Sequence, residues 1–133
     1  MKTILIVDDD PIIVQVYRTR LQTGGYRVEV ADDGLAAMKI ILELRPDLIL
    51  LDVLMPKVEG TYVLKFIRSR PDLKGTRVIV LSNASNADVA KAVLAQQPDQ
   101  VFLKSQATPR DVLAAVNQLL GGEIAAPPPP PAP

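Results

Sequence analysis

The chain contains no cysteine and no histidine. Thiol nucleophiles, zinc sites made of thiolates or imidazoles, and catalytic triads centred on histidine are therefore excluded, and any bound metal ion must be held by oxygen atoms. An excess of one charge is missing too, because 15 basic residues balance 15 acidic ones. This balance gives no indication of nucleic acid or a membrane surface as a partner.

Long hydrophobic runs are also absent. The first apolar run ends at Asp8, which makes it too short for the hydrophobic region of a signal peptide, and no run approaches the length of a membrane span. We therefore expect a cytoplasmic protein.

The 133 residues are 48% apolar and 23% charged, which is typical of one globular domain. We expect this domain to cover residues 1–122. Residues 123–133 include five consecutive prolines at 127–131 and are predicted to be a tail or linker. A spacer or plain tail is the favoured interpretation, and a role as ligand for an SH3-type domain stays open.

Five short segments are predicted to be β-strands. Four are continuous apolar runs, which indicates parallel strands buried on both faces: residues 4–7, 48–51, 78–81 and 101–103. The fifth segment, residues 26–30, alternates apolar residues with Arg27 and Glu29 and indicates an edge strand.

Helical spacing of apolar residues marks the segments between the strands. In the first, Asp10 is the expected N-cap, Pro11 the first helical residue and Gly24-Gly25 the stop. Its predicted inner face consists of Ile12, Ile13, Val16, Tyr17 and Leu21.

Four further helices are predicted, over residues 35–44, 62–67 and 87–95 and after a capping box at 108–111. The inner face of the last helix is expected to be Val112, Leu113, Val116, Leu119 and Leu120. Five alternations of strand and helix predict an α/β fold: a doubly wound, flavodoxin-like parallel sheet of order 2-1-3-4-5 with helices on both faces. Ligands of such sheets bind outside the carboxyl ends of the strands.

Polar residues follow four of the predicted strands at that edge. They are Asp8 and Asp9 after the first strand, Asp52 after the third, Ser82 after the fourth and Lys104 after the fifth. These strands are neighbours in the predicted order, so we expect the five side chains to meet.

Three carboxylates in one place repel one another, by about 4 kcal/mol for each pair at roughly 4 Å and an effective dielectric constant near 20. Lys104 compensates only one charge, so Mg²⁺ is the expected cofactor. Asp52 could then form an aspartyl-phosphate whose oxygens contact the metal, Lys104 and the Ser82 hydroxyl. Because the chain lacks a nucleotide loop of the form GxxxxGKS/T, these features favour a phosphoryl acceptor over a kinase.

These residues resemble those of response-regulator receiver domains, including the single-domain chemotaxis receiver. The resemblance covers roughly residues 2–121. Its elements are ILIVDDD at 4–10, LLDVLMP at 50–56 with Glu59-Gly60, VLS at 80–82 and LK at 103–104. The ordered set is far more specific than an Asp pair alone.

The resemblance implies that Asp52 accepts a phosphoryl group from a phosphohistidine on a sensor histidine kinase or histidine phosphotransfer protein. It implies that Asp9 binds Mg²⁺ directly and Asp8 largely through water, with Asp52 and the Leu54 carbonyl as further ligands. No role at the metal is carried over to Asp10, because a helix cap explains it.

The resemblance further implies that Ser82 is the switch hydroxyl and Lys104 the partner of the phosphoryl oxygens, with output through the face of the fourth helix, fifth strand and fifth helix. The chain departs from the family at positions that concern this output. Ser105 replaces the usual proline, Asn83 a small apolar residue, Val101 the usual aromatic residue, and Gln97-Pro98 a turn with glycine.

We expect phosphorylation to propagate weakly or differently here, and Phe102 to face away from the side of Val101. The resemblance implies that Leu54 and Ala84 flank the path of attacking water, which neither side chain can orient, so we also expect slow autodephosphorylation. Two alternatives remain: a pseudo-receiver that docks partners without phosphorylation and, more distantly, a magnesium phosphatase. The phosphatase needs a second acid where Leu54 stands, so we predict a signalling domain rather than an enzyme.

Overall fold

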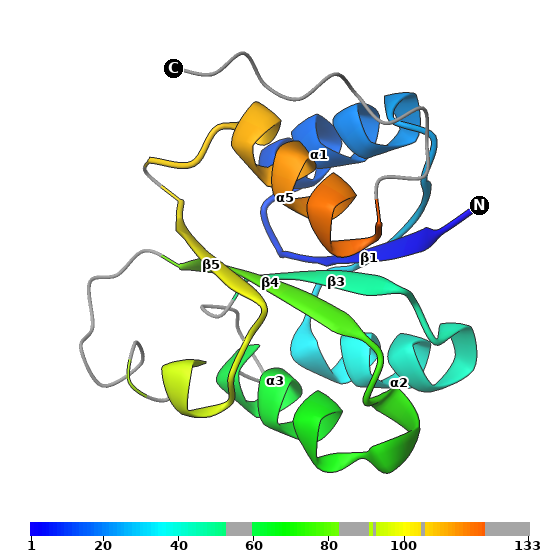
Figure 1. Cartoon of the computed structure of the whole chain (residues 1–133), viewed down its shortest axis with the longest axis vertical. Helices are drawn as coiled ribbons and strands as arrows, with labels where there is room; N and C mark the ends of the chain where they lie inside the picture. Colours follow the sequence, from blue (N-terminus) through cyan, green and yellow to red (C-terminus); the bar gives the residue numbers. More distant parts are fainter. Residues whose placement is uncertain (53–59, 83–90, 92, 105, 122–133) are drawn as a thin grey trace.

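The computed structural model describes residues 1–52, 60–82, 91, 93–104 and 106–121. These residues form a five-stranded parallel sheet between two layers of helices (Figure 1). The strand order, β2-β1-β3-β4-β5, is the predicted one. Within these residues no helix has both the length and the apolar composition that a membrane crossing requires.

The observed strands agree with the predicted ones to within one residue at each end. They are β1 (Thr3–Val7), β2 (Arg27–Ala31), β3 (Leu48–Asp52), β4 (Arg77–Ser82) and β5 (Gln100–Leu103). The helices are α1 (Pro11–Thr23), α2 (Gly34–Leu44), α3 (Gly60–Ser69) and α5 (Pro109–Leu119), with an unpredicted 3-10 turn, η1 (Pro71–Leu73). The helix predicted over 87–95 lies mostly outside the described residues. Within that range, the structure describes residues 91 and 93–95, and all four are helical.

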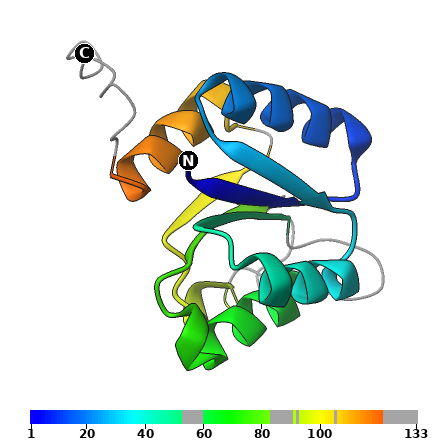
Figure 2. The same ribbon diagram turned by 90° about the vertical axis from the view of Figure 1, so that its right-hand side faces the viewer.

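Helices α1 and α5 cover one face of the sheet and α2 and α3 the other, as Figures 1 and 2 show. In β1, Ile4 and Ile6 are buried in the α1/α5 layer, while Leu5 and Val7 are buried in the α2/α3 layer. The residues of β3 and β4 alternate in the same way. Burial on both faces explains why these strands are continuous apolar runs.

The prediction that β5 is buried on both faces is wrong. All its residues are half-buried or exposed, because β5 is the last strand of the sheet and pairs with β4 alone. Val101 packs in the α2/α3 layer and Phe102 in the α1/α5 layer. The expectation that these two side chains face opposite sides is confirmed.

The inner face predicted for α1 is partly wrong. Ile12 and Val16 are 73% and 40% exposed, whereas Tyr17 is buried and Val14, which was not predicted, packs against the core. Ile13 packs there as predicted. Core residues recur every three to four positions, and Ile12 and Val16 lie more than about 100° around the helix from the middle of that stripe.

Helix ends follow the predicted capping chemistry. Asp10 accepts hydrogen bonds from the first turn of α1, and Pro11 is its first residue. In α5, Thr108 and Asp111 form a reciprocal capping box. Both helices begin at the carboxyl edge of the sheet, where the predicted site lies.

Two aspartates at the opposite, amino edge extend the strand pairing by one residue. The Asp47 N–H donates to the Thr3 carbonyl at 2.9 Å, and its Oδ2 accepts from the Thr3 N–H at 2.8 Å. Asp99 makes the same exchange with Val78, at 2.9 and 2.8 Å. Each carboxylate thus takes the place of a peptide carbonyl at the start of a strand.

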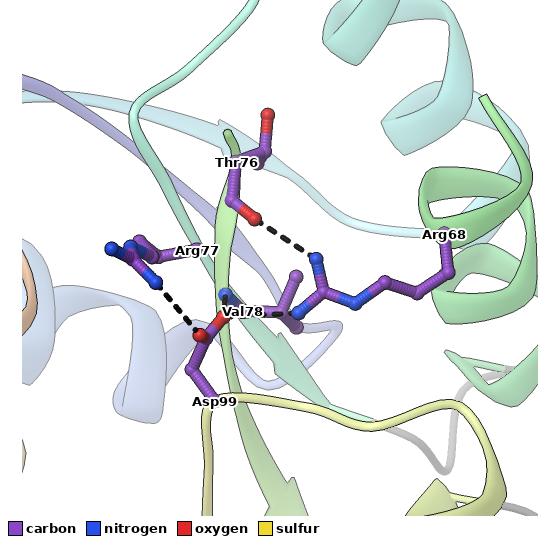
Figure 3. A network of polar contacts seen from close by, with 5 residues as sticks. All are labelled: Arg68, Thr76, Arg77, Val78 and Asp99. Atoms are coloured by element: carbon purple, nitrogen blue, oxygen red, sulfur yellow. Dashed lines mark hydrogen bonds and ion pairs between the residues drawn. The ribbon is translucent and has the colours of Figure 1, made fainter. Parts of the chain in front are cut away.

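Asp99 is also the centre of a half-buried polar network (Figure 3). It accepts from Arg68 of α3 at 2.9 Å and from Arg77 of β4 at 3.3 Å. Arg68 donates in addition to the Thr76 carbonyl at 3.0 Å. The network therefore fixes the beginning of β5 to α3 and β4.

The residue before each of these Pro-Asp pairs has a left-handed backbone. Arg45 precedes Pro46-Asp47 with φ 48°, and Gln97 precedes Pro98-Asp99 with φ 55°. This region costs a residue with a Cβ roughly 1–2 kcal/mol and suits glycine. The turn before β5 has Gln97 where the family usually has a glycine, so the backbone of this turn is strained.

We expect Gln97→Gly to stabilise the chain by roughly 0.5–1 kcal/mol in urea unfolding, because glycine removes this strain at a smaller entropic cost. Gln96→Gly is the matched control, since Gln96 has no positive φ. The control should destabilise the chain by a similar amount. Equal destabilisation by both changes would contradict the assignment of strain to Gln97.

Candidate functional site

Asp8 and Asp52 lie side by side at the carboxyl edge of the sheet. Asp8 follows β1 and Asp52 ends β3, and the adjacent residues Val7 and Leu51 are paired in register. The Asp8 N–H donates to the Ala31 carbonyl at 3.1 Å, so its backbone is fixed to β2 as well. Both carboxylates are buried, at 2% exposure.

Asp9 completes a cluster of three acids. Its side chain is exposed, yet one carboxylate oxygen each from Asp8, Asp9 and Asp52 lies within 4.8 Å of the others. The predicted meeting of these three side chains is therefore confirmed.

Lys104 reaches this cluster from the end of β5. Its Nζ donates to Asp52 Oδ2 at 3.0 Å and forms an ion pair with Asp8 Oδ2 at 3.3 Å. Burial alone would lower the pKa of Lys104, but the hydrogen bond that Lys104 donates to Asp52 and the charges of both carboxylates outweigh it and raise the pKa. Lys104 is accordingly a fixed positive charge at neutral pH.

The two oxygens of Asp8 have different surroundings. Oδ1 accepts a hydrogen bond from the Asp10 N–H at 2.9 Å. Oδ2 is buried, and no described residue donates a hydrogen bond to it, since Lys104 approaches as an ion pair only. Burial and the neighbouring charge of Asp52 raise the pKa of Asp8, against the lowering effects of the Asp10 N–H and Lys104.

This arrangement fits a hard divalent cation. Three carboxylates face one ammonium group, and a buried carboxylate oxygen lacks a donor among the described residues. Two ligand atoms on one Mg²⁺ ion are at most roughly 4.2 Å apart, twice the ligand distance of about 2.1 Å. The cluster therefore needs only a small side-chain movement, or a bridging water, to hold the ion.

Ser82 is buried at the end of β4, where its carbonyl accepts a hydrogen bond from the Lys104 N–H at 2.8 Å. The predicted role of its hydroxyl stays a prediction. Leu54, Asn83, Ala84 and Ser105 lie outside the described residues, so the predictions that rest on them are not tested.

The contact between Asp10 and Asp8 was missed in the sequence. Asp10 had been interpreted only as a helix cap, but its main-chain N–H also holds a site carboxylate. An aspartate that accepts from the N–H two residues later forms an Asx turn, which is common at the end of a strand. That spacing within Asp8-Asp9-Asp10 is the signal that could have revealed the contact.

In metal-free buffer, we expect Asp8→Asn to stabilise the chain by about 1 kcal/mol, or roughly 3 °C in Tm, because it removes a buried charge and keeps the oxygen facing Asp10. A raised folded-state pKa means that ionised Asp8 costs stability. The gain should therefore be small at or below the ordinary value of 3.8 and grow as pH rises through the raised pKa.

Thermal unfolding in EDTA across this pH range measures the effect. The exposed Asp32 offers a matched control, and Asp32→Asn should change stability by less than about 0.5 kcal/mol. A lower Tm for Asp8→Asn than for the unmodified chain at neutral pH would contradict the electrostatic account of the site.

The chain is similar to known proteins in sequence and fold. A family model described as "Response regulator receiver domain" matches residues 4–117. The alkaline phosphatase synthesis transcriptional regulatory protein PhoP of Bacillus subtilis is 35% identical over 127 residues, which make up 95% of this chain and 52% of PhoP. The chain spans about half the length of the curated relatives it matches.

Solved structures agree with the family model. The receiver domain of a signal transduction histidine kinase from Syntrophus aciditrophicus superposes with a TM-score of 0.85 at 30% identity, covering 92% of both chains. The Mn²⁺-bound form of response regulator Rcp1 has a TM-score of 0.77 at 29% identity and covers 96% of this chain and 98% of Rcp1. Since the family model spans most of the sequence and the fold is shared, the chain belongs to the response regulator receiver domain family.

Proposed function

We propose that this receiver domain accepts a phosphoryl group on Asp52 from a phosphohistidine of a partner sensor histidine kinase or histidine phosphotransfer protein, in a magnesium-dependent step. The supporting observation is the buried Asp52 carboxylate, held by Lys104 at 3.0 Å within a cluster of two further acids. These 133 residues contain no histidine, so the proposed phosphohistidine lies outside them.

In this step a carboxylate oxygen of Asp52 attacks phosphorus. A P–O bond forms as the P–N bond to the imidazole breaks, and the imidazole nitrogen keeps the electron pair and takes a proton from solvent. Lys104, protonated throughout because its pKa is raised, neutralises charge on the transferred oxygens. A carboxylate nucleophile has no proton to lose, so the attack by Asp52 needs no general base.

Asp8, Asp9, Asp52 and the Leu54 carbonyl are the proposed magnesium ligands. Bound Mg²⁺ would neutralise phosphoryl charge and bring the donor phosphate toward Asp52. The Mn²⁺-bound form of the similar response regulator Rcp1 supports a divalent cation in this family. The cluster of three acids around a single ammonium group, that of Lys104, supports it in this chain.

Output is proposed to pass through the face formed by the fourth helix, β5 and α5. Support comes from Lys104, which directly follows β5 and connects that half-exposed strand to Asp52. Val101 is smaller than the aromatic residue that the family usually has at this position of β5. We therefore propose that phosphorylation changes the output face weakly or differently in this chain. We also propose that the protein is cytoplasmic, that this domain does not bind nucleic acid, and that it acts as a signalling domain rather than an enzyme.

Incubation with Mg²⁺ and acetyl phosphate tests the acceptor chemistry. We expect intact mass spectrometry to show the addition of one phosphoryl group, which hydroxylamine removes because an acyl phosphate is a mixed anhydride whose acyl carbon reacts with hydroxylamine. EDTA should prevent the addition, and Asp52→Asn should abolish it, while Asp72→Asn, at an exposed acid remote from the cluster, should not. A wild-type chain that gains no mass would favour the pseudo-receiver, a docking module without phosphorylation.

A further inference from the structure

We propose that Asp10 is a positioning residue for the metal site: its side chain fixes its own main-chain N–H, and that N–H fixes the Asp8 carboxylate. The inference deepens the proposed function and rests on it. It assigns to the third acid of Asp8-Asp9-Asp10 a role that does not depend on its charge.

The first step concerns the torsional freedom of Asp8. Its backbone is held to β2 by the hydrogen bond to Ala31 at 3.1 Å, so the side-chain rotation is what remains to be fixed. The Asp10 N–H, at 2.9 Å from Oδ1, fixes it. Oδ2 is thereby presented to Lys104 and to the cluster with Asp52.

The second step concerns what holds the Asp10 N–H. The Asp10 Oδ1 accepts from Ile12 at 2.9 Å and from Ile13 at 3.5 Å, while its carbonyl accepts from Val14 at 3.0 Å. Pro11 restricts the residue before it to extended backbone, and Asp10 has φ −89° and ψ 110°. The cap, the first helical hydrogen bond and Pro11 therefore restrict the backbone angles of Asp10, and these angles set the direction of its N–H.

The third step separates the cap from the charge. The Asp10 side chain is exposed, and its capping hydrogen bonds are solvent-exposed, so its charge is screened by water and salt. Asparagine and serine cap helices about as well as aspartate, whereas alanine does not. Variants at position 10 can thus keep the cap while they remove the charge.

Calorimetric titration of the full chain with Mg²⁺ tests the proposal on Asp10→Asn, Asp10→Ser and Asp10→Ala. The asparagine and serine variants should bind Mg²⁺ within about two-fold of wild type, and the alanine variant about 10-fold more weakly, as is typical when the orienting partner of a ligand is lost. In metal-free buffer, the amide hydrogen of residue 10 should exchange faster in the alanine variant alone.

Thr108→Ala is the matched control, because it removes the N-cap of α5, whose Oγ accepts from the Asp111 N–H at 3.1 Å. It should lower Tm by a few degrees, as Asp10→Ala does, and leave Mg²⁺ affinity unchanged. Wild-type affinity in Asp10→Ala would show that the cap is structural only, and equal weakening in Asp10→Asn would show that charge acts instead. A wild-type chain that binds no Mg²⁺ would overturn the proposed metal site itself, and this role with it.

Discussion

The ion pairs of Lys104 with Asp8 and Asp52 are the interaction on which the rest of the site depends. Lys104 compensates one of three negative charges, and the neighbouring carboxylates of Asp8, Asp9 and Asp52 repel one another. Burial, together with the charge of Asp52, raises the pKa of Asp8, so its ionised form lowers the stability of the chain when no cation is bound. The clustered acids therefore lower the stability of the free chain and at the same time raise its proposed affinity for a metal ion.

Strand β5 depends on polar contacts at both of its ends. Its side chains are only partly buried, but Asp99 fixes its beginning to α3 and β4, and Lys104 connects its end to the acids. An edge strand held in this way can respond to a change at Lys104 while its other end stays anchored. This geometry supports the proposed output through β5.

The sheet order and the acid cluster could be predicted from the sequence, because β1, β3 and β4 are apolar on both faces and polar residues begin where each ends. The exposure of Ile12 and Val16 could not be predicted, because the apolar residues of α1 form two adjacent stripes and only tertiary packing decides which one is buried. The predicted strand order places β5 at the edge of the sheet and so indicates partial exposure. Its continuous apolar run indicates burial on both faces instead, and that interpretation was wrong. The contact of Asp10 with Asp8 depends on the backbone direction of a turn, which composition does not specify.

A crystal structure of the chain with Mg²⁺ and beryllofluoride tests the central claim most directly. The account predicts beryllofluoride on Asp52, Mg²⁺ among Asp8, Asp9 and Asp52, and Lys104 Nζ shifted from Asp8 Oδ2 to a fluorine atom. Lys104 still paired with both carboxylates, with neither Mg²⁺ nor beryllofluoride bound at saturating concentrations, would contradict it.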